Sequence, residues 1–239
     1  MLSKLLRLLP ASTRAKLQHK ARRWVGTSTG YTVIGAKGPL AVGVFEKIRD
    51  IPGWFTLDDC AHFQLVMEMQ SMNGVTGDMF EIGSYHGRST AMMAAGLKPG
   101  EKIHVCDAFD SDTEDHYGNK PTQETVISNI RKVTPGIEDT QIVTYKCLSN
   151  DIQLPADQKF RLVHIDGGHS AEQVYFDLEL CARHLCDKGV IVIDDYANRM
   201  WPTVSVGVDK YLEDNPVFNV LADMNRHGAQ GRKLYIYRS

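Results

Sequence analysis

Residues 160–196, FRLVHIDGGHSAEQVYFDLELCARHLCDKGVIVIDDY, combine two short apolar runs with a longer amphipathic segment between them. The runs Phe160–Ile165 and Gly189–Ile193 have the length and composition of buried strands. The segment between them predicts a helix over about Ala171–Cys186. Its apolar side chains recur on one helical face at Val174, Leu178, Cys181 and Leu185. A strand, a helix and a second strand in this order predict two parallel strands joined by a crossover helix.

Start and turn signals border this helix. Ser170 and Gln173 have the spacing of a capping box at its start, and Asp187–Gly189 predicts a turn into the second strand. Three earlier runs have the same strand-like character: Met79–Ile82, Lys102–Cys106 and Gln141–Tyr145. The alternation of such strands with helical segments predicts a doubly wound α/β sheet.

Further elements lie at the two ends of this pattern. Thr56 is the expected N-cap of a helix over Leu57–Ser71. The buried stripe expected for this helix consists of Cys60, Phe63, Leu65, Val66 and Met69. After a helix near Thr203–Leu212, the runs Val217–Leu221 and Lys233–Tyr237 predict a C-terminal hairpin. We therefore expect a mostly parallel seven-stranded sheet that ends in an antiparallel C-terminal strand.

The composition excludes several classes of protein. A chain of 239 residues suits one α/β domain whose core is large enough to fold without disulfides. The five cysteines are scattered and form no Cys-x-x-Cys pair, which indicates a reducing compartment and argues against a zinc or redox centre. No run approaches the roughly 20 consecutive apolar residues of a membrane-spanning helix. We therefore expect a cytoplasmic protein without a transmembrane segment.

The first 50 residues differ in charge from the rest of the chain. Eight basic residues and no acidic residue precede Glu46, although the formal net charge of the whole chain is -2. Met1–Trp24 combines these cations with leucines, as in a helix that packs on a partner subunit, lies on an anionic membrane surface or serves as an organellar presequence. Val25–Lys37 predicts an irregular connector. We assign residues 1–50 to this region and 51–239 to the main domain.

The first strand of the sheet ends in a glycine turn, Gly83-Ser84-Tyr85-His86-Gly87. Its two glycines let the backbone approach a ligand closely, although such a pair is also typical of a simple turn. The G-x-G-x-x-G motif that holds a pyrophosphate at a helix N-terminus is absent. A cofactor without phosphate, such as S-adenosylmethionine, does not require that motif.

The second strand ends in Asp107, where a carboxylate can accept hydrogen bonds from both hydroxyls of a ribose. NAD enzymes use the same device, so this aspartate alone does not separate the two cofactors. An aspartate that caps a loop turn is the structural alternative. Asp107 is therefore a candidate ribose ligand.

From about Trp54 to the C-terminus the chain resembles the class I S-adenosylmethionine-dependent methyltransferases. Within them it resembles the metal-dependent small-molecule branch that includes the macrolide and aminocoumarin sugar O-methyltransferases. The resemblance rests on FEIGSYHGRST, CDAFD and HIDGGHSAEQVYFDLELCARHLCDKGVIVIDDY, with Ser84 where many methyltransferases carry glycine. It implies that Glu81, Gly83 and Gly87 line the methionine part of the cofactor, that Asp107 holds the ribose and that Ser149 lies near the adenine. The cofactor-binding candidates are Glu81, Gly83, Ser84, Gly87, Ser89, Asp107 and Ser149.

Three aspartates follow neighbouring strands: Asp166 ends the fourth, and Asp194 and Asp195 end the fifth. Because parallel strands end at one edge of a sheet, these carboxylates should converge there. Converging carboxylates raise a pKa unless a cation lies between them, and Mg²⁺ prefers carboxylate oxygens. A single strand-end aspartate often caps the next helix, but the combination predicts a divalent-metal site. The resemblance implies the same three ligands, because the sugar enzymes bind their metal in this way.

His169 lies on the loop after Asp166 and is the candidate general base, with Asp166 as its catalytic partner at the metal. An exposed histidine at a helix entrance is the alternative. We expect His164 to be buried without a chemical role and His86 to shape the glycine turn. The acceptor would lie beneath a mobile cover, Ser111–Pro121. Candidate acceptor contacts are Tyr196, Arg199 and Trp201.

These observations predict Mg²⁺-dependent transfer of a methyl group from S-adenosylmethionine to a hydroxyl of a small molecule, such as a sugar or another natural product. A NAD-dependent oxidoreductase is an alternative that fits Asp107 but lacks the phosphate-binding turn. A non-catalytic protein that binds S-adenosylmethionine is a second. A nucleic-acid methyltransferase is disfavoured, because the chain is acidic after its basic start. As partners we expect a small-molecule substrate and a second copy of the chain.

Overall fold

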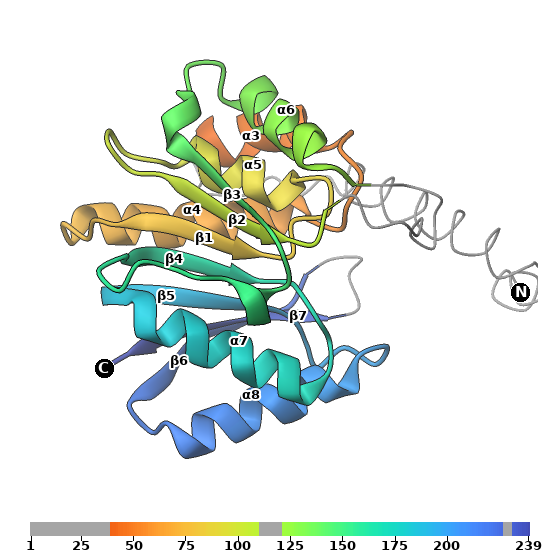
Figure 1. The fold of residues 1–239 in the computed structure, drawn as a ribbon, viewed down its shortest axis with the longest axis vertical. Helices are drawn as coiled ribbons and strands as arrows, with labels where there is room; N and C mark the ends of the chain where they lie inside the picture. Colours follow the sequence, from red (N-terminus) through yellow and green to blue (C-terminus); the bar gives the residue numbers. More distant parts are fainter. Residues whose placement is uncertain (1–38, 110–120, 227–230) are drawn as a thin grey trace, which may run out of the picture.

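The structure is a computed structural model that describes residues 39–109, 121–226 and 231–239. Its centre is a seven-stranded sheet with the order β3-β2-β1-β4-β5-β7-β6 (Figure 1). The strands are β1 (Asp78–Ile82), β2 (Ile103–Asp107), β3 (Ile142–Lys146), β4 (Phe160–Ile165), β5 (Leu185–Tyr196), β6 (Phe218–Met224) and β7 (Arg232–Arg238). All pairings are parallel except those of β7, which runs antiparallel to β5 and β6. The predicted fold class is confirmed.

Helices cover both faces of this sheet (Figure 1). One face packs against α3 (Pro39–Ile48), α4 (Leu57–Met72), α5 (Arg88–Ala95) and α6 (Gln123–Val133). The other face packs against α7 (Ala171–His184) and α8 (Pro202–Asp214). The described residues also form the short 3-10 helices η1 (Asp139–Gln141) and η2 (Ser149–Asp151). The strands form continuous apolar runs in the sequence because both faces of the sheet are covered.

The strand order reverses between β1 and β4. From β1 the chain proceeds outward through β2 to β3, returns to β4 on the other side of β1, and continues to β5. In such sheets ligands bind beyond the carboxyl ends of the strands at this point of reversal. The residues that follow β1, β4 and β5 therefore surround the expected site.

Helix α4 begins as predicted but buries a different stripe. Thr56 accepts a hydrogen bond from the Asp59 N–H while the Asp59 side chain accepts from Thr56, which completes a capping box. Leu65 and Met69 were expected in the buried stripe but are 54% and 41% exposed, whereas Met67 is buried. The packing of α4 on the sheet selects the face through Cys60, Phe63, Val66 and Met67.

The boundary between α7 and β5 differs from the prediction. The helix ends at His184 rather than Cys186, and Leu185 already pairs with Phe160 of β4. The next pair is Leu162 with Val190, so the predicted turn at Asp187–Gly189 is instead an irregularity within β5. The predicted capping box is only half formed. Ser170 accepts from the Gln173 N–H, whereas the Gln173 amide donates to Ser149 and Asp177.

The predicted C-terminal hairpin is confirmed, because β6 and β7 pair antiparallel. Val44, Phe45 and Ile48 of α3 are buried in the core that α4 and α5 share, although the predicted main domain begins only at residue 51. The predicted N-terminal helix and connector, and residues 111–120 of the predicted cover, lie outside the described residues. All five cysteines are unpaired. Among the described helices, none has the length and apolar character needed to span a membrane.

Candidate active site

The glycine turn after β1 packs directly against the end of β4. Gly83 has a left-handed backbone with φ +80°, and a Cβ at this position would overlap with the carbonyl group of Asp166. The N–H of Asp166 in turn donates to the carbonyl of Ile82 at 2.8 Å. The absence of a side chain at Gly83 therefore allows the glycine turn and the start of the β4–α7 loop to lie in contact.

Replacing Gly83 by alanine should destabilise the protein more than replacing Gly74. Both residues have left-handed backbones, with φ of +80° and +66°, so both variants bear the same conformational penalty. Only Gly83 also faces the Asp166 carbonyl, whereas among the described residues no atom lies within 4 Å of a Cβ at Gly74. We expect Gly83→Ala to lower the free energy of unfolding by about 1–3 kcal/mol more than Gly74→Ala does, as measured by urea unfolding. Equal losses would show that the close approach does not constrain the turn.

Asp107 holds the glycine turn in place through hydrogen bonds. Its Oδ2 accepts hydrogen bonds from the Ser84 N–H (2.7 Å), the Ser84 hydroxyl (3.1 Å) and the Tyr85 N–H (3.0 Å). Its Oδ1 accepts one from the Phe109 N–H (3.1 Å). The structure thus gives Asp107 the turn-capping role that was the alternative to ribose binding. Oδ1 retains a second lone pair, so the carboxylate can still accept a hydrogen bond from a ribose hydroxyl.

The far end of the turn is also tightly packed. Gly87 is the N-cap of α5 with φ +77°, and a Cβ there would lie 2.9 Å from Val126. The carbonyl of His86 accepts a hydrogen bond from Asn129 of α6 at 2.9 Å, which fits the expected role of His86 in shaping the turn. Ser89 is buried in the first turn of α5. These contacts hold the glycine turn between α5 and α6.

Two of the predicted cofactor ligands make contacts in the protein interior instead. Glu81 is fully buried, and its carboxylate contacts the hydroxyl of Thr90 and Nδ1 of His164 (2.7 Å). The Ser149 hydroxyl donates to Asp177 at 2.6 Å. Residues 83–87 and Asp107 are therefore brought together at the turn. The side chains of Glu81 and Ser149 instead form hydrogen bonds with other residues of the protein.

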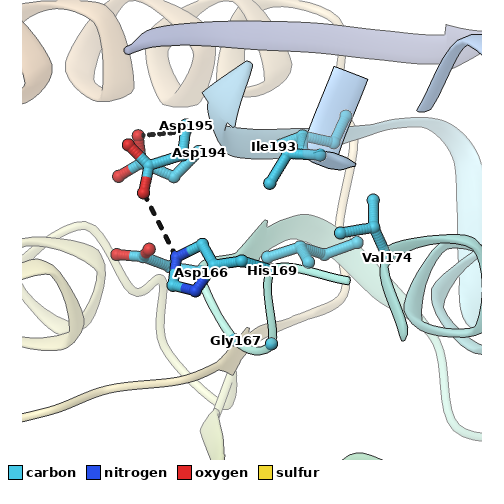
Figure 2. Close-up of a pocket in the computed structure, with 10 residues that line it drawn as sticks. Asp166, Gly167, His169, Val174, Ile193, Asp194 and Asp195 are labelled. Atoms are coloured by element: carbon cyan, nitrogen blue, oxygen red, sulfur yellow. Dashed lines mark hydrogen bonds and ion pairs between the residues drawn. The ribbon is translucent and has the colours of Figure 1, made fainter. Parts of the chain in front are cut away.

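The predicted carboxylates converge at the ends of β4 and β5. Figure 2 shows the Asp166 carboxylate beside the ring of His169, with Asp194 and Asp195 opposite them on β5. Nε2 of His169 lies 3.3 Å from Oδ2 of Asp195. We call the group formed by Asp166, His169, Asp194 and Asp195 the acidic rim. Together with Gly167, the acidic rim lines a pocket between the β4–α7 loop and β5.

Two buried cations bind Asp194. Lys233 Nζ lies 2.5 Å from Asp194 Oδ2, and Arg226 Nη2 lies 2.7 Å from Asp194 Oδ1. Lys233 also donates to Nε2 of His164 at 2.8 Å, and Nδ1 of His164 faces Glu81. Burial lowers the pKa of His164 and the Lys233 charge lowers it further, which favours a neutral ring that donates to Glu81 and accepts from Lys233. A row of polar side chains thus crosses the sheet from β1 to β7.

The pKa values of Asp166 and Asp194 shift in opposite directions. Burial raises the pKa of Asp166 well above its ordinary value, and the charges of Asp194 and Asp195 raise it further. Burial also acts to raise the pKa of Asp194, but the charges of Arg226 and Lys233 outweigh it and hold that pKa well below its ordinary value. Asp166 is therefore the carboxylate whose charge is least compensated, and an added cation would favour its ionised form.

Within the part of the chain that the structure describes, two sets of side chains bring potential metal ligands within 4.8 Å of one another. The first comprises His164, Asp166 and Asp194. Here the Lys233 ammonium group already contacts both His164 and Asp194. The second comprises Asp166, His169 and Asp195. A divalent cation therefore fits best between Asp166 and Asp195, while Asp194 is held by the protein's own cations.

The same fold occurs in solved O-methyltransferases. The O-methyltransferase NovP superimposes with a TM-score of 0.63 at 19% identity, covering 94% of this chain and 99% of that chain. An O-methyltransferase from Bacillus cereus in complex with SAH gives 0.56 at 15% identity, covering 92% and 97%. TomG from Streptomyces achromogenes in complex with SAM gives 0.56 at 12% identity, covering 95% and 97%. No curated protein is matched by sequence.

The sequence also matches a known family over its central part. Residues 80–196 match the family described as a methyltransferase domain, and this range contains the glycine turn, Asp107 and the whole acidic rim. These residues form a class I methyltransferase domain. The predicted methyltransferase family is thereby confirmed.

Two residues of the methyltransferase site were missed by sequence analysis. Arg226 lies just after β6, and Lys233 is the second residue of β7, so both are far along the chain from Asp194. Lys233 is fully buried, yet in the sequence it stands beside Arg232 as one of two basic residues before an apolar run. Alternation along a strand would place Lys233 on the same face as buried Tyr235, and this was the available signal. His164, expected to have no chemical role, joins the same network.

In the methyltransferase, the three residues predicted to contact the acceptor lie in different surroundings. Trp201 lies flat on the ring of His169, with the ring centroids 4.3 Å apart and an interplanar angle of 15°. The Tyr196 hydroxyl donates to Asp209 of α8 at 2.9 Å, and Arg199 is exposed on the loop between them. Trp201 alone of the three packs against a residue of the acidic rim.

Proposed function

We propose that this methyltransferase transfers a methyl group from S-adenosylmethionine to a hydroxyl of a small molecule, with the help of a divalent cation such as Mg²⁺. One observation carries the proposal: Asp166, His169 and Asp195 gather ligand atoms within 4.8 Å of one another. The backbone of Asp166 packs against the glycine turn, so this group lies beside the expected donor site.

Each residue of the group has a chemical task in the proposal. A neutral alcohol is a weak nucleophile, and a bound divalent cation lowers the pKa of an alcohol oxygen that it contacts. Asp166 and Asp195 would supply the carboxylate oxygens that Mg²⁺ prefers. His169 would accept the hydroxyl proton, since an imidazole is partly unprotonated at neutral pH. Asp194, predicted as a third ligand, would instead anchor Arg226 and Lys233 beneath the rim.

The proposed acceptor is a sugar or another natural product. The named neighbours support a hydroxyl as the methylated group, because NovP and TomG are O-methyltransferases. CalS11, a TDP-rhamnose 3'-O-methyltransferase, shares the fold with a TM-score of 0.55 at 12% identity, covering 96% of both chains. The acidic rim also opposes a nucleic-acid substrate, because its carboxylates would repel the phosphate backbone.

The donor site can be tested by ligand-induced stabilisation. S-adenosylhomocysteine at 100 times its Kd should raise the free energy of unfolding by about 2.7 kcal/mol. NAD(H) should leave it unchanged, because the turn lacks the pyrophosphate-binding motif. Thermal unfolding with each ligand measures both effects. Stabilisation by NAD(H) alone would favour the oxidoreductase alternative.

The reaction itself can be tested with S-adenosylmethionine labelled in its methyl group. A panel of sugar nucleotides, macrolides and phenols tests hydroxyl acceptors, and amine analogues of the same compounds are the matched controls. The proposal expects label on oxygen, in a reaction that requires Mg²⁺ or another divalent cation. Label on amines alone, or on added RNA or DNA alone, would contradict it.

A further inference from the structure

The indole of Trp201 restrains the face of the His169 ring. The two rings stack nearly parallel, although they come from different loops, the first before α8 and the second before α7. Trp201 is 40% exposed. Its large apolar side chain therefore covers the imidazole on one side and remains partly open to solvent. Aromatic pairs of this kind contribute about 0.5–1.5 kcal/mol beyond the area that they bury. The stack is strong enough to favour one ring orientation.

Two further contacts hold His169. Its carbonyl accepts a hydrogen bond from the Thr203 hydroxyl at 2.6 Å, and its Nε2 faces Asp195 at 3.3 Å. Without such contacts the residue would be poorly fixed, because Gly167 and Gly168 precede it and the terminal torsion of histidine has broad minima. Thr203 and Trp201 both belong to the start of α8. The β5–α8 segment therefore holds both the backbone and the ring of His169.

The segment that carries Trp201 is itself rigid. The Trp201 N–H donates to the carbonyl of Asn198, and the Trp201 carbonyl accepts from the Val204 N–H, both at 3.1 Å. Asn198 is buried, and its amide donates to Oδ1 of Asp195 at 2.6 Å. Asp195 and Ala197 have left-handed backbones, with φ of 57° and 54°, which persist only where the surroundings enforce them. One rigid segment thus fixes both Asp195 and the indole.

We propose that Trp201 is a positioning residue for His169: its indole holds the imidazole in the plane from which a ring nitrogen meets the acceptor hydroxyl at the acidic rim. This inference rests on the proposed function, since it assumes that His169 accepts the proton. The alternative is that Trp201 touches the acceptor directly, as a stacking surface. The two roles differ in whether the effect of Trp201 requires His169.

A double-mutant cycle separates these roles. Trp201→Ala should lower kcat about tenfold and leave KM for the acceptor within about twofold, because a misplaced catalytic group slows the reaction without weakening binding. Trp201→Phe should retain kcat within about threefold, because a phenyl ring can also stack. Met200→Ala is the matched control, because Met200 is a 64% exposed apolar neighbour on the same loop, and it should match the wild type.

The decisive comparison is made in the absence of the imidazole. His169→Ala should lower kcat by about 10², the lower end of the range for a general base, and adding Trp201→Ala should lower it no further. A second tenfold loss in the double variant, or a loss confined to KM, would overturn the inference in favour of acceptor contact. Wild-type kinetics of Trp201→Ala would overturn it too. Wild-type kinetics of His169→Ala would instead remove the proposed base and the inference with it.

An NMR measurement tests the stack without any acceptor. In protein labelled at histidine, the His169 ring signal is assigned by its loss in His169→Ala. The indole above it should shift this signal upfield of an exposed histidine, and Trp201→Ala should abolish the shift. Circular dichroism of the same sample checks that the variant is folded. A His169 signal that does not respond to Trp201→Ala would contradict the inference, even if methyl transfer to hydroxyls is established.

Discussion

Asp166→Asn should lower methyl transfer by about 10³-fold, or ~4 kcal/mol of transition-state stabilisation, while the folded protein becomes no less stable. The substitution keeps the shape of the side chain and removes the charge that would hold a cation with Asp195. S-adenosylhomocysteine should bind with nearly unchanged affinity, because the contact with the glycine turn involves the Asp166 backbone. Isothermal titration calorimetry and initial rates measure these two effects.

The stability expectation follows from the pKa of Asp166. Burial and the charges of Asp194 and Asp195 raise the folded-state pKa of this carboxyl above its unfolded value. Such a carboxylate disfavours the folded state as pH rises through the unfolded pKa and beyond. Without a cation, Asp166→Asn should therefore unfold at an equal or higher urea concentration than the wild type at neutral pH. A large loss of stability would indicate that Asp166 has a structural role.

Removal of the metal provides an independent comparison. Dialysis against EDTA should abolish wild-type activity, and Mg²⁺ should restore it, whereas Mg²⁺ at any concentration should leave the activity of Asp166→Asn at its lowered level. Asp157→Asn is the matched control, because Asp157 is exposed in the turn before β4 and away from the rim. If the EDTA-treated enzyme and Asp166→Asn both turn over normally, the metal proposal is wrong.

Most of the fold could be predicted from the sequence because both faces of the sheet are buried. Met79 and Phe80 pack into opposite cores, so β1 is an apolar run that is visible without structural information. The rim could be predicted for a related reason. Asp166 directly follows β4, and Asp194 lies near the end of β5. These two strands pair in parallel, so they end at the same edge of the sheet.

The remaining features depend on contacts that local patterns do not specify. Leu65 is apolar and stands at a plausible spacing, but α4 packs on the core through Cys60, Phe63, Val66 and Met67 and leaves Leu65 exposed. Asp107 can bind a ribose or cap a turn, and only the path of the glycine turn decides that three donors reach its Oδ2. The pairing of Lys233 with Asp194 requires β7 to insert beside β5, which no short motif indicates.

A second buried charge pair lies at the opposite end of the sheet from the site. Arg161 at the start of β4 is fully buried, and its guanidinium donates to both carboxylate oxygens of Glu101 at 2.8–3.0 Å. It also donates to the Gln70 side chain (3.0 Å) and the Gly96 carbonyl (2.9 Å). Arg161 thus joins the ends of α4 and α5 to the amino-terminal edge of the sheet.

Glu101→Ala should destabilise the protein by about 3–5 kcal/mol, because it leaves the Arg161 charge buried without its partner. Adding Arg161→Met should recover part of this loss, since no unpaired charge then remains. Asp139→Ala, which removes the partner of Arg131 in an exposed pair, should have little effect. Urea unfolding measures all three, and S-adenosylhomocysteine binding to the folded fraction should stay unchanged because the pair lies away from the acidic rim. If Glu101→Ala costs no more than Asp139→Ala, the buried pair does not hold these elements together.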